Sequence, residues 1–360
     1  MNTRQSNKLD FKGQNIYIGI DVHLKSWSVE VLSQSSVLKK FRQDPQPEAL
    51  HKFLTTHYPG ASYYSVYEAG FCGFWIDRRL KELGINNIVV NAADVPTMSR
   101  EKLRKTDAVD CGKLARGLRN GDLRGIYVPD TTTLELRSLI RLRNSIVKDT
   151  TREKNRIKSL LRFHGIEIPE QFTGHSSNWS KRFIQWLREA GLATEYGRKT
   201  LDLHIEQFLR LRAMLLQETR AIRNMARSEK FAESMRLITS VPGLGMITGA
   251  SFVIEIDDIS RFKNAYHLAS YVGLIPMCHS SGEKDGTGDI TIRKHATLRG
   301  NIIEAAWVAI RTDPAMTLAY EGYRKRMNAN KAIVKIARKL VNRIYFVLKR
   351  QQEYVSCVVR

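Results

Sequence analysis

The sequence lacks the marks of a secreted, disulfide-bonded or membrane-spanning protein. Only four cysteines occur in 360 residues, and no two form a C-x-x-C pair or stand near a histidine pair at zinc-ligand spacing: Cys72, Cys111, Cys278 and Cys357. We expect free thiols in a reducing compartment. The opening MNTRQSNKLDFKGQN is polar, and no run of about 18 apolar residues occurs. We therefore expect a cytoplasmic protein without a secretory signal or a transmembrane helix.

Acidic residues are few beside the basic ones. The chain has 58 Lys and Arg against 36 Asp and Glu, a formal net charge of +22. Such an excess of positive charge is informative about the binding partners of a protein and not about its fold. Nucleic-acid backbones are the commonest partner, because Lys and Arg displace their counterions. The net charge alone does not exclude membrane surfaces or ribosomes as partners. A hydrophobic fraction of 42% over this length is enough for two or three domains.

The first third of the chain predicts an α/β domain over residues 14–130, after a flexible tail at 1–13. Hydrophobic periodicity and glycine stops predict strands at 16–21, 27–32, 37–41, 63–69 and 85–91, and helices at 47–59, 71–84 and 107–121. Three strands followed by alternating helix and strand is the order of a ribonuclease-H-like fold. A doubly wound dinucleotide fold would begin strand–helix–strand, with a G-x-G-x-x-G loop that is missing here.

The rest of the chain predicts mainly helix. Residues 131–230 form a basic helical segment, with helices at about 135–165, 179–191 and 195–227, which pack as a coiled coil, on a second subunit, or serve as a plain linker. The C-terminal domain over 231–360 begins with a helix, a Pro-Gly-Leu-Gly turn and a helix at 237–256. This pattern resembles a helix-hairpin-helix, whose turn glycines could approach a phosphate. A basic amphipathic helix is predicted at 331–349.

Four carboxylates form the candidate metal site. Asp21 ends the first predicted strand and Glu68 the fourth, and these strands are neighbours in the predicted topology. Asp107 and Asp110 lie three residues apart on a helix, so they share one face. Hard oxygen ligands suit Mg²⁺ or Mn²⁺, which can assist reactions at phosphorus. An ordinary explanation also exists, because acids in a first helical turn favour the helix dipole.

A polar stretch at 271–301 contains a second candidate. Ser280 and Ser281 precede Gly282 in a predicted loop, and Arg293, Lys294, His295 and Arg299 follow. A serine among cations can attack phosphorus, since the cations stabilise the developing charge. Serine and glycine in a loop more often serve the turn itself.

Together these motifs resemble the DEDD-type transposases of insertion sequences, which are related to the Piv-like DNA invertases. The resemblance covers about residues 14–310. Its motifs are G-I-D at 19–21, V-Y-E-A-G at 66–70, K-T-D-A-V-D at 105–110, V-P-G-L-G at 241–245, R-F at 261–262, Y-V-G-L-I-P at 271–276, S-G at 281–282 and L-R at 298–299. One departure is Lys294-His295, where family members often have Gly-Asn, which affects the expected loop geometry and DNA contacts.

The resemblance implies an N-terminal domain similar to the junction resolvase RuvC, a helical segment and a C-terminal transposase domain. It maps the four acids to Asp21, Glu68, Asp107 and Asp110, and the nucleophile to Ser281, with Ser280 as the alternative. It further implies donor and target DNA, a structured guide RNA, a homodimer or homotetramer, and a nucleoid-associated place in a bacterial or archaeal cell. Candidate nucleic-acid contacts are Lys105, Arg152, Arg156, Gly243, Gly245, Arg293, Lys294 and Arg299.

Three other functions compete. A junction resolvase or nuclease would use the acids with water and would not need Ser281. An ATP-binding protein of the actin and sugar-kinase fold also opens on G-I-D, but its first hairpin needs Gly and Ser or Thr, and this chain has V-H-L-K-S. A nucleic-acid-binding protein without activity would hold the acids only for structure.

Overall fold

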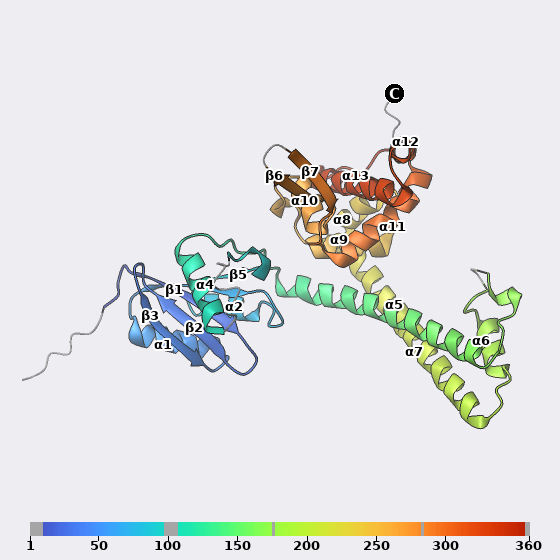
Figure 1. The fold of residues 1–360 in the computed structure, drawn as a ribbon, viewed down its shortest axis with the longest axis horizontal. Coiled ribbons are helices and arrows are strands. Elements are labelled where there is room, and N and C mark those ends of the chain that lie inside the picture. Colours follow the sequence, from blue (N-terminus) through green and yellow to red (C-terminus); the bar gives the residue numbers. More distant parts are fainter. Residues whose placement is uncertain (1–9, 97–106, 175–176, 282–283, 357–360) are drawn as a thin grey trace, which may run out of the picture. The chain divides into compact units, whose positions relative to one another are not determined.

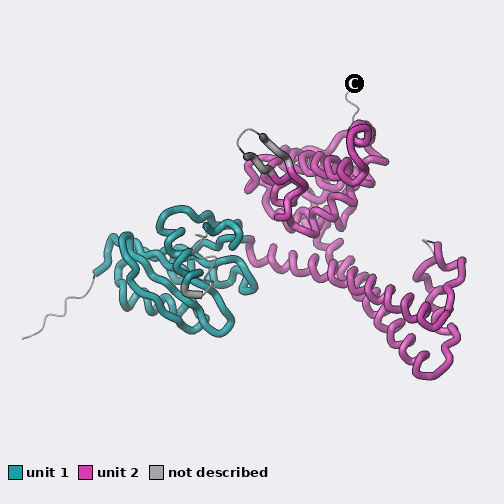
Figure 2. The backbone as a smooth tube through the Cα atoms, viewed as in Figure 1, with its two compact units in different colours: residues 1–128 teal, residues 129–360 magenta. Residues whose placement is uncertain are grey.

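The chain divides into two compact units, residues 1–128 and residues 129–360 (Figures 1 and 2). The structure is a computed structural model, and it describes residues 10–96, 107–174, 177–281 and 284–356. The first unit is mixed α/β and the second is mostly helical (Figure 1). This agrees with the fold class predicted for the two parts of the chain.

A five-stranded sheet forms the centre of the first unit. Its strands are β1 (Asn15–Val22), β2 (Trp27–Leu32), β3 (Val37–Gln43), β4 (Ser62–Glu68) and β5 (Asn86–Val90). The spatial order is β3-β2-β1-β4-β5. The first three strands form an antiparallel meander, while β4 pairs parallel to β1 and β5 parallel to β4. The prediction that the first and fourth strands are neighbours is confirmed.

Alternation along the strands gives this sheet two different faces. The helices described in this unit are α1 (Pro47–His57), α2 (Trp75–Glu82), the 3-10 turn η1 (Ala92–Asp94) and α4 (Asp107–Arg119). On one face Ile16, Ile18 and Ile20 are fully buried in a cluster that includes Leu50 of α1 and Leu80 of α2. The apolar core of the unit therefore lies between the sheet and α1 and α2.

The other face is covered by α4, which approaches β1 closely. A Cβ atom at Gly19 would lie 2.0 Å from the carbonyl oxygen of Cys111 and 2.6 Å from the backbone nitrogen of Ala115. On the helix itself, a Cβ at Gly112 would lie 2.5 Å from Oε2 of Glu30. The neighbours of Gly19 are backbone atoms, so only glycine fits there, whereas the neighbour of Gly112 is the end of a side chain. The helix and the sheet are thus in backbone contact where β1 and α4 cross.

Long helices open the second unit. They are α5 (Thr131–Phe163), the 3-10 turn η2 (Glu170–Phe172), α6 (Lys181–Glu189) and α7 (Glu195–Ala226), and α5 packs along α7 (Figure 1). Side-chain oxygens of Asp130, Ser180 and Thr194 cap the first turns of α5, α6 and α7. Each helix predicted here is confirmed, and α5 and α7 bury their apolar faces against each other and α6.

The remainder of the second unit surrounds the C-terminal helix α13. Its elements are α8 (Glu229–Thr239), α9 (Met246–Ile256), the 3-10 turn η3 (Ile259–Arg261), α10 (Ala265–Val272), β6 (Pro276–Ser281), β7 (Lys284–Ile290), α11 (Ala296–Thr312), α12 (Pro314–Arg324) and α13 (Ala329–Arg350). Ile336, Leu340 and Ile344 of α13 are fully buried against α8, α10, α11 and α12. The amphipathic helix predicted at 331–349 is confirmed, and its apolar face is the buried one.

The prediction that the two serines lie in a loop is wrong, because their backbone forms a strand. Ser280 and Ser281 belong to strand β6 and are the Cα partners of Asp285 and Lys284 in β7. The segment 276–290 is rich in Ser, Gly and Asp, which are weak strand formers, so its composition hides the pairing. Gly282 lies outside the described residues. Within the described ranges, none of the helices is both long and apolar enough for a membrane span.

Substitution Gly19→Ala is expected to lower the free energy of unfolding by about 3 kcal/mol, because the new methyl group would enter the backbone of α4. Urea unfolding followed by circular dichroism measures this. Gly70→Ala is the matched control in the same unit, since its nearest neighbour would lie 4.0 Å away. Equal stability of the two variants would contradict the close contact between α4 and β1.

Candidate functional site

Asp21 and Glu68 stand at the same level of two neighbouring parallel strands. The register pairs Gly19 with Val66 and Ile20 with Tyr67, so the next step brings Asp21 beside Glu68. Because side chains alternate along a strand, both carboxylates share the face of Gly19 and Val66. This is the face that α4 covers.

Helix α4 carries a third predicted acid to this face. Asp110 directly precedes Cys111, whose carbonyl oxygen makes the closest approach to Gly19. The Asp110 carboxylate is 23% exposed, and its Oδ1 lies 2.7 Å from Nζ of Lys113. Asp107 is the first residue of α4, but its side chain lies outside the described part of the structure. Two strand-terminal acids and the first turn of α4, which carries Asp110, thus lie on one face of the sheet.

The Asp21 carboxylate already has a basic neighbour. Its Oδ2 lies 3.0 Å from Nε2 of His23, which donates a hydrogen bond, and the carboxylate is 22% exposed. Among the described side chains, which leave out that of Asp107, no group of three or more His, Cys, Asp or Glu could hold a metal ion. The donor set of Asp21, Glu68 and Asp110 nevertheless has the hard oxygens and partial exposure that divalent ions require.

A further acid, which no sequence motif reveals, lies on this face. Glu30 is fully buried and pairs with Gly19 across β1 and β2, and its Oε2 lies 2.7 Å from Nζ of Lys40. Burial, and after it the negative charges of Glu30 and Asp21, together raise the pKa of the Cys111 thiol to about 11. Cys111 is therefore a neutral thiol at neutral pH. In the alternating segment W-S-V-E-V-L, Glu30 reads as a solvent-facing residue, and only the cover provided by α4 buries it.

The hairpin that carries Ser281 is held at its base by arginines. Nη1 of Arg299 donates to the carbonyl oxygens of Gly273, at 3.0 Å, and Thr291, at 2.7 Å. These two residues stand just before β6 and just after β7. Nη1 of Arg338 donates to the carbonyl oxygen of Leu274 at 3.0 Å. The side chain of Ser281 lies outside the described part, so the structure gives its strand and its register only.

A buried carboxylate joins this region to α5. Glu255 accepts two hydrogen bonds of 3.0 Å from Arg141. Its Oε2 also lies 3.3 Å from Nε2 of His295, and Arg137 donates to its backbone oxygen. Burial alone would raise the pKa of Glu255, but the hydrogen bonds and charges of His295 and Arg141 outweigh it and lower the pKa to about 2. His295 also accepts from the N–H of Leu298 through Nδ1, which caps α11.

The residues predicted to contact nucleic acid lie in several places. Arg152 and Arg156 are exposed on α5, and each forms an ion pair with the acid three residues before it, at 2.7 and 3.0 Å. Arg293 and Lys294 are exposed beyond β7. Lys105 lies outside the described residues. No single surface of the described chain therefore gathers all of the predicted contacts.

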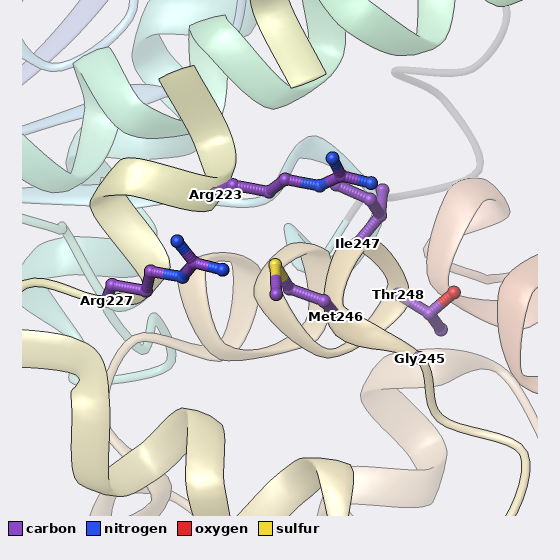
Figure 3. Close-up of a pocket in the computed structure, with 6 residues that line it drawn as sticks. All are labelled: Arg223, Arg227, Gly245, Met246, Ile247 and Thr248. Atoms are coloured by element: carbon purple, nitrogen blue, oxygen red, sulfur yellow. The ribbon is translucent and has the colours of Figure 1, made fainter. Parts of the chain in front are cut away.

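The two predicted turn glycines differ in their surroundings. At Gly243, where φ is +85°, a Cβ would lie 2.2 Å from the carbonyl oxygen of Ala305, whereas nothing lies within 4 Å at Gly245. Gly245 precedes α9 and lines a cavity of about 390 Å³ with Arg223 of α7 and Arg227, the residue that follows α7 (Figure 3). Gly243 is thus required by packing on α11, while Gly245 is accessible to a ligand.

Family models match both parts of the chain. Residues 235–321 match the model described as Transposase IS116/IS110/IS902 family. Residues 18–166 match a second model, described as transposase, of the IS110 DEDD type. The second match includes all four predicted acids, and the first includes Ser280 and Ser281.

Relatives named as transposases are similar over most of the chain. The protein y4rJ of Sinorhizobium fredii is 30% identical over 305 residues, which are 77% of this chain and 74% of that protein. The transposase for insertion sequence element IS1111A of Coxiella burnetii is 26% identical over 266 residues, 70% of this chain and 69% of the relative. The protein y4qE of Sinorhizobium fredii is 28% identical over 244 residues, 68% of this chain but 58% of that protein.

These matches define the class as transposases, the enzymes that cut and rejoin DNA. Within that class, the chain belongs to the IS110 family of DEDD transposases of insertion sequences. The resemblance drawn from the short motifs is confirmed at the level of the family.

Gly243→Ala is expected to lower the free energy of unfolding by at least about 2 kcal/mol, because a left-handed backbone and a backbone clash both oppose a side chain there. Gly245→Ala is expected to leave stability within about 0.5 kcal/mol of the wild type. Thermal unfolding of the two variants side by side measures the difference. A Gly245→Ala variant as unstable as Gly243→Ala would contradict the open surroundings of Gly245.

The low pKa of Glu255 predicts a specific acid sensitivity. A carboxylate whose pKa is depressed on folding stabilises the protein above its unfolded pKa of about 4.3, and this contribution is lost as pH falls toward the folded pKa of about 2. Glu255→Gln is expected to destabilise the chain by about 3 kcal/mol at pH 7, because the buried Arg137 and the partly buried His295 lose a carboxylate partner.

The measurement is urea unfolding at a series of pH values. Between pH 4.5 and pH 2.5, the stability gap between wild type and Glu255→Gln is expected to narrow, and a constant gap would contradict the assignment. Glu233→Gln, which removes an exposed carboxylate from α8, controls for the general effect of charge.

Proposed function

We propose that the chain is a site-specific recombinase of an insertion sequence that cuts DNA through a serine nucleophile, assisted by divalent metal at Asp21, Glu68, Asp107 and Asp110. The observation that carries the metal half is the meeting of two strand-terminal acids and the acid-bearing α4 on one sheet face. The strand order, three antiparallel strands followed by two parallel ones, supports the RuvC-like, ribonuclease-H-like assignment of this domain. Mg²⁺ or Mn²⁺ bound there would stabilise the negative charge on the oxygen that leaves phosphorus.

Ser281 is the proposed nucleophile. Its Oγ attacks the scissile phosphorus as its proton is removed, the bond from phosphorus to the leaving deoxyribose oxygen breaks, and that oxygen takes up a proton. The phosphoserine link keeps one phosphate ester for each one broken, so the reverse step rejoins DNA without ATP. Support comes from the place of Ser281 at the end of β6 in a hairpin braced by Arg299 and Arg338. A braced hairpin limits the movement of the attacking group.

The partners proposed for this reaction are donor DNA, target DNA and a structured RNA that guides the choice of both. The net charge of +22 supports polyanionic partners, and the exposed Arg152, Arg156, Arg293 and Lys294 can contact their phosphates. Gly245, open beside Arg223 and Arg227, is a further proposed phosphate contact (Figure 3). A homodimer or homotetramer is proposed because several strands must be cut together.

Ser281→Ala is expected to abolish a covalent protein–DNA complex that survives denaturing electrophoresis, and to reduce strand cleavage at least about 10³-fold, since no other group takes the place of the nucleophile. The assay uses the full chain, labelled terminal DNA of the element, its RNA and Mg²⁺. Ser280→Ala is the matched control, one residue away, and is expected to retain the adduct. Loss of the adduct in Ser280→Ala alone would move the role to Ser280.

The carboxylates separate this proposal from its rivals. Asp21→Asn and Asp110→Asn are expected to keep DNA binding while losing cleavage. Near wild-type cleavage by Ser281→Ala, without an adduct, would instead identify a nuclease that uses water. Wild-type recombination by both Asn variants would contradict the proposed role of the metal.

A further inference from the structure

Four cations gather near the end of α5 that lies next to α6 (Figure 1). Lys154, Lys158 and Arg162 follow one another at intervals of four residues, so they line one face of α5. Arg212 of α7 is held beside them by a hydrogen bond of 3.2 Å from its Nη1 to the carbonyl oxygen of Trp179. We call these four residues the tip cluster. Like charges four residues apart on a helix repel each other, so this arrangement lowers stability unless an anion binds to it.

Trp179 is the centre around which the tip cluster is arranged. Nζ of Lys154 lies 5.5 Å from the centroid of its ring and 5.7 Å from that of Phe208, and Nζ of Lys158 lies 6.0 Å from the Trp179 ring. Trp179 and Phe208 are buried. The aromatic faces stabilise the ammonium groups in place but do not neutralise their charge.

The tip cluster has no acidic partner among the described residues. No ion pair joins any of its four members to a described carboxylate, and Glu153 pairs instead with His204 and Arg156, and Asp202 with Arg198. Burial lowers the pKa of Lys154, and the charges of Lys158 and Arg212 lower it further. The cluster is therefore a concentration of positive charge that an external anion would stabilise.

A cavity of about 610 Å³ opens beside this charge. Lys158 and Arg162 stand on its rim, Ile166, Ile168 and Phe172 form apolar walls, and Asn178 and Glu167 supply polar groups. Its size falls within the range of small-molecule sites. Apolar walls with amide and carboxylate groups suit a nucleobase, and the cationic rim suits the phosphate attached to it.

We propose that the tip cluster and this cavity bind an unpaired nucleotide of a nucleic-acid strand, with its phosphates on Lys158 and Arg162 and its base in the cavity. This inference rests on the proposed function, because it supposes nucleic acid as the partner. An unpaired nucleotide is required because a base within a duplex is stacked and cannot enter a cavity. RNA loops and single-stranded DNA share this chemistry.

The test compares Lys158→Gln with Lys199→Gln in the full chain. Both variants remove one positive charge from the α5–α7 pair, but Lys199 is exposed on α7 outside the tip cluster. Fluorescence anisotropy over a range of salt uses three probes, an unstructured RNA oligonucleotide, the same sequence as single-stranded DNA, and the DNA duplex. Lys158→Gln is expected to weaken binding of a single strand roughly fourfold near physiological salt and to reduce the salt slope by about 0.7, relative to Lys199→Gln.

The outcomes separate the alternatives. Duplex affinity is expected to be equal in the two variants, and Lys158→Arg is expected to retain single-strand binding. An equal loss of affinity for single strand and duplex would show that Lys158 contacts only the phosphate backbone and that no base enters the cavity. A loss of affinity no greater than that of Lys199→Gln would show that the tip cluster is not a binding site. Failure of the wild-type chain to bind any of the probes would instead contradict the proposed function. The RNA and DNA probes identify which strand the site prefers.

The melting temperature of Lys158→Gln shows whether this variant is correctly folded. Because the substitution removes repulsion from Lys154, its melting temperature without nucleic acid is expected to equal or exceed that of the wild type. A lower melting temperature would mean that Lys158 stabilises the fold, and Lys158→Arg would then decide the question, since it keeps the charge. Loss of single-strand binding in a well-folded Lys158→Arg would overturn the charge-based site.

Discussion

The contact between the backbones of α4 and β1 is the constraint on which the first unit depends. Gly19 and Gly112 together let the helix lie directly on the sheet. This contact brings Asp110 to the face that holds Asp21 and Glu68, and it seals Glu30 beneath the helix. A sheet covered at ordinary helix–sheet distance would leave these carboxylates further apart. The charges around the proposed metal site thus depend on the absence of a side chain at Gly19.

Charge in this transposase is concentrated rather than spread evenly. In a chain of net charge +22, several acids are collected on one face of the first unit, while the tip cluster collects cations without a described acidic partner. Concentrations of one sign cost stability in the protein alone. Each has a natural counterpart in a transposition reaction, a divalent cation for the acids and phosphates for the cations. The places where charge of one sign is concentrated are therefore the places where external partners are proposed.

The second unit uses arginine and glutamate to brace the hairpin of Ser281. Arg299 belongs to the L-R motif and was predicted to contact nucleic acid. Its Nη1 donates hydrogen bonds to two backbone carbonyl oxygens at the base of the hairpin. Glu255 joins Arg141 of α5 to His295, which caps α11. These bonds explain why the motif needs an arginine even without a phosphate nearby, since one guanidinium nitrogen can donate to two oxygens at once.

The sequence by itself determined the order of strands and helices in the first unit, the neighbourhood of Asp21 and Glu68, and the family, because hydrophobic periodicity and strand-terminal acids are local signals. Only the tertiary structure decided that Glu30 is buried, that Ser280 and Ser281 belong to a strand, and that Gly243 serves packing while Gly245 stands open. The physical reason is the same in each case. Burial, strand pairing and close backbone contact depend on residues distant in the chain, and no local pattern of apolar and polar residues records which distant segment will lie against them.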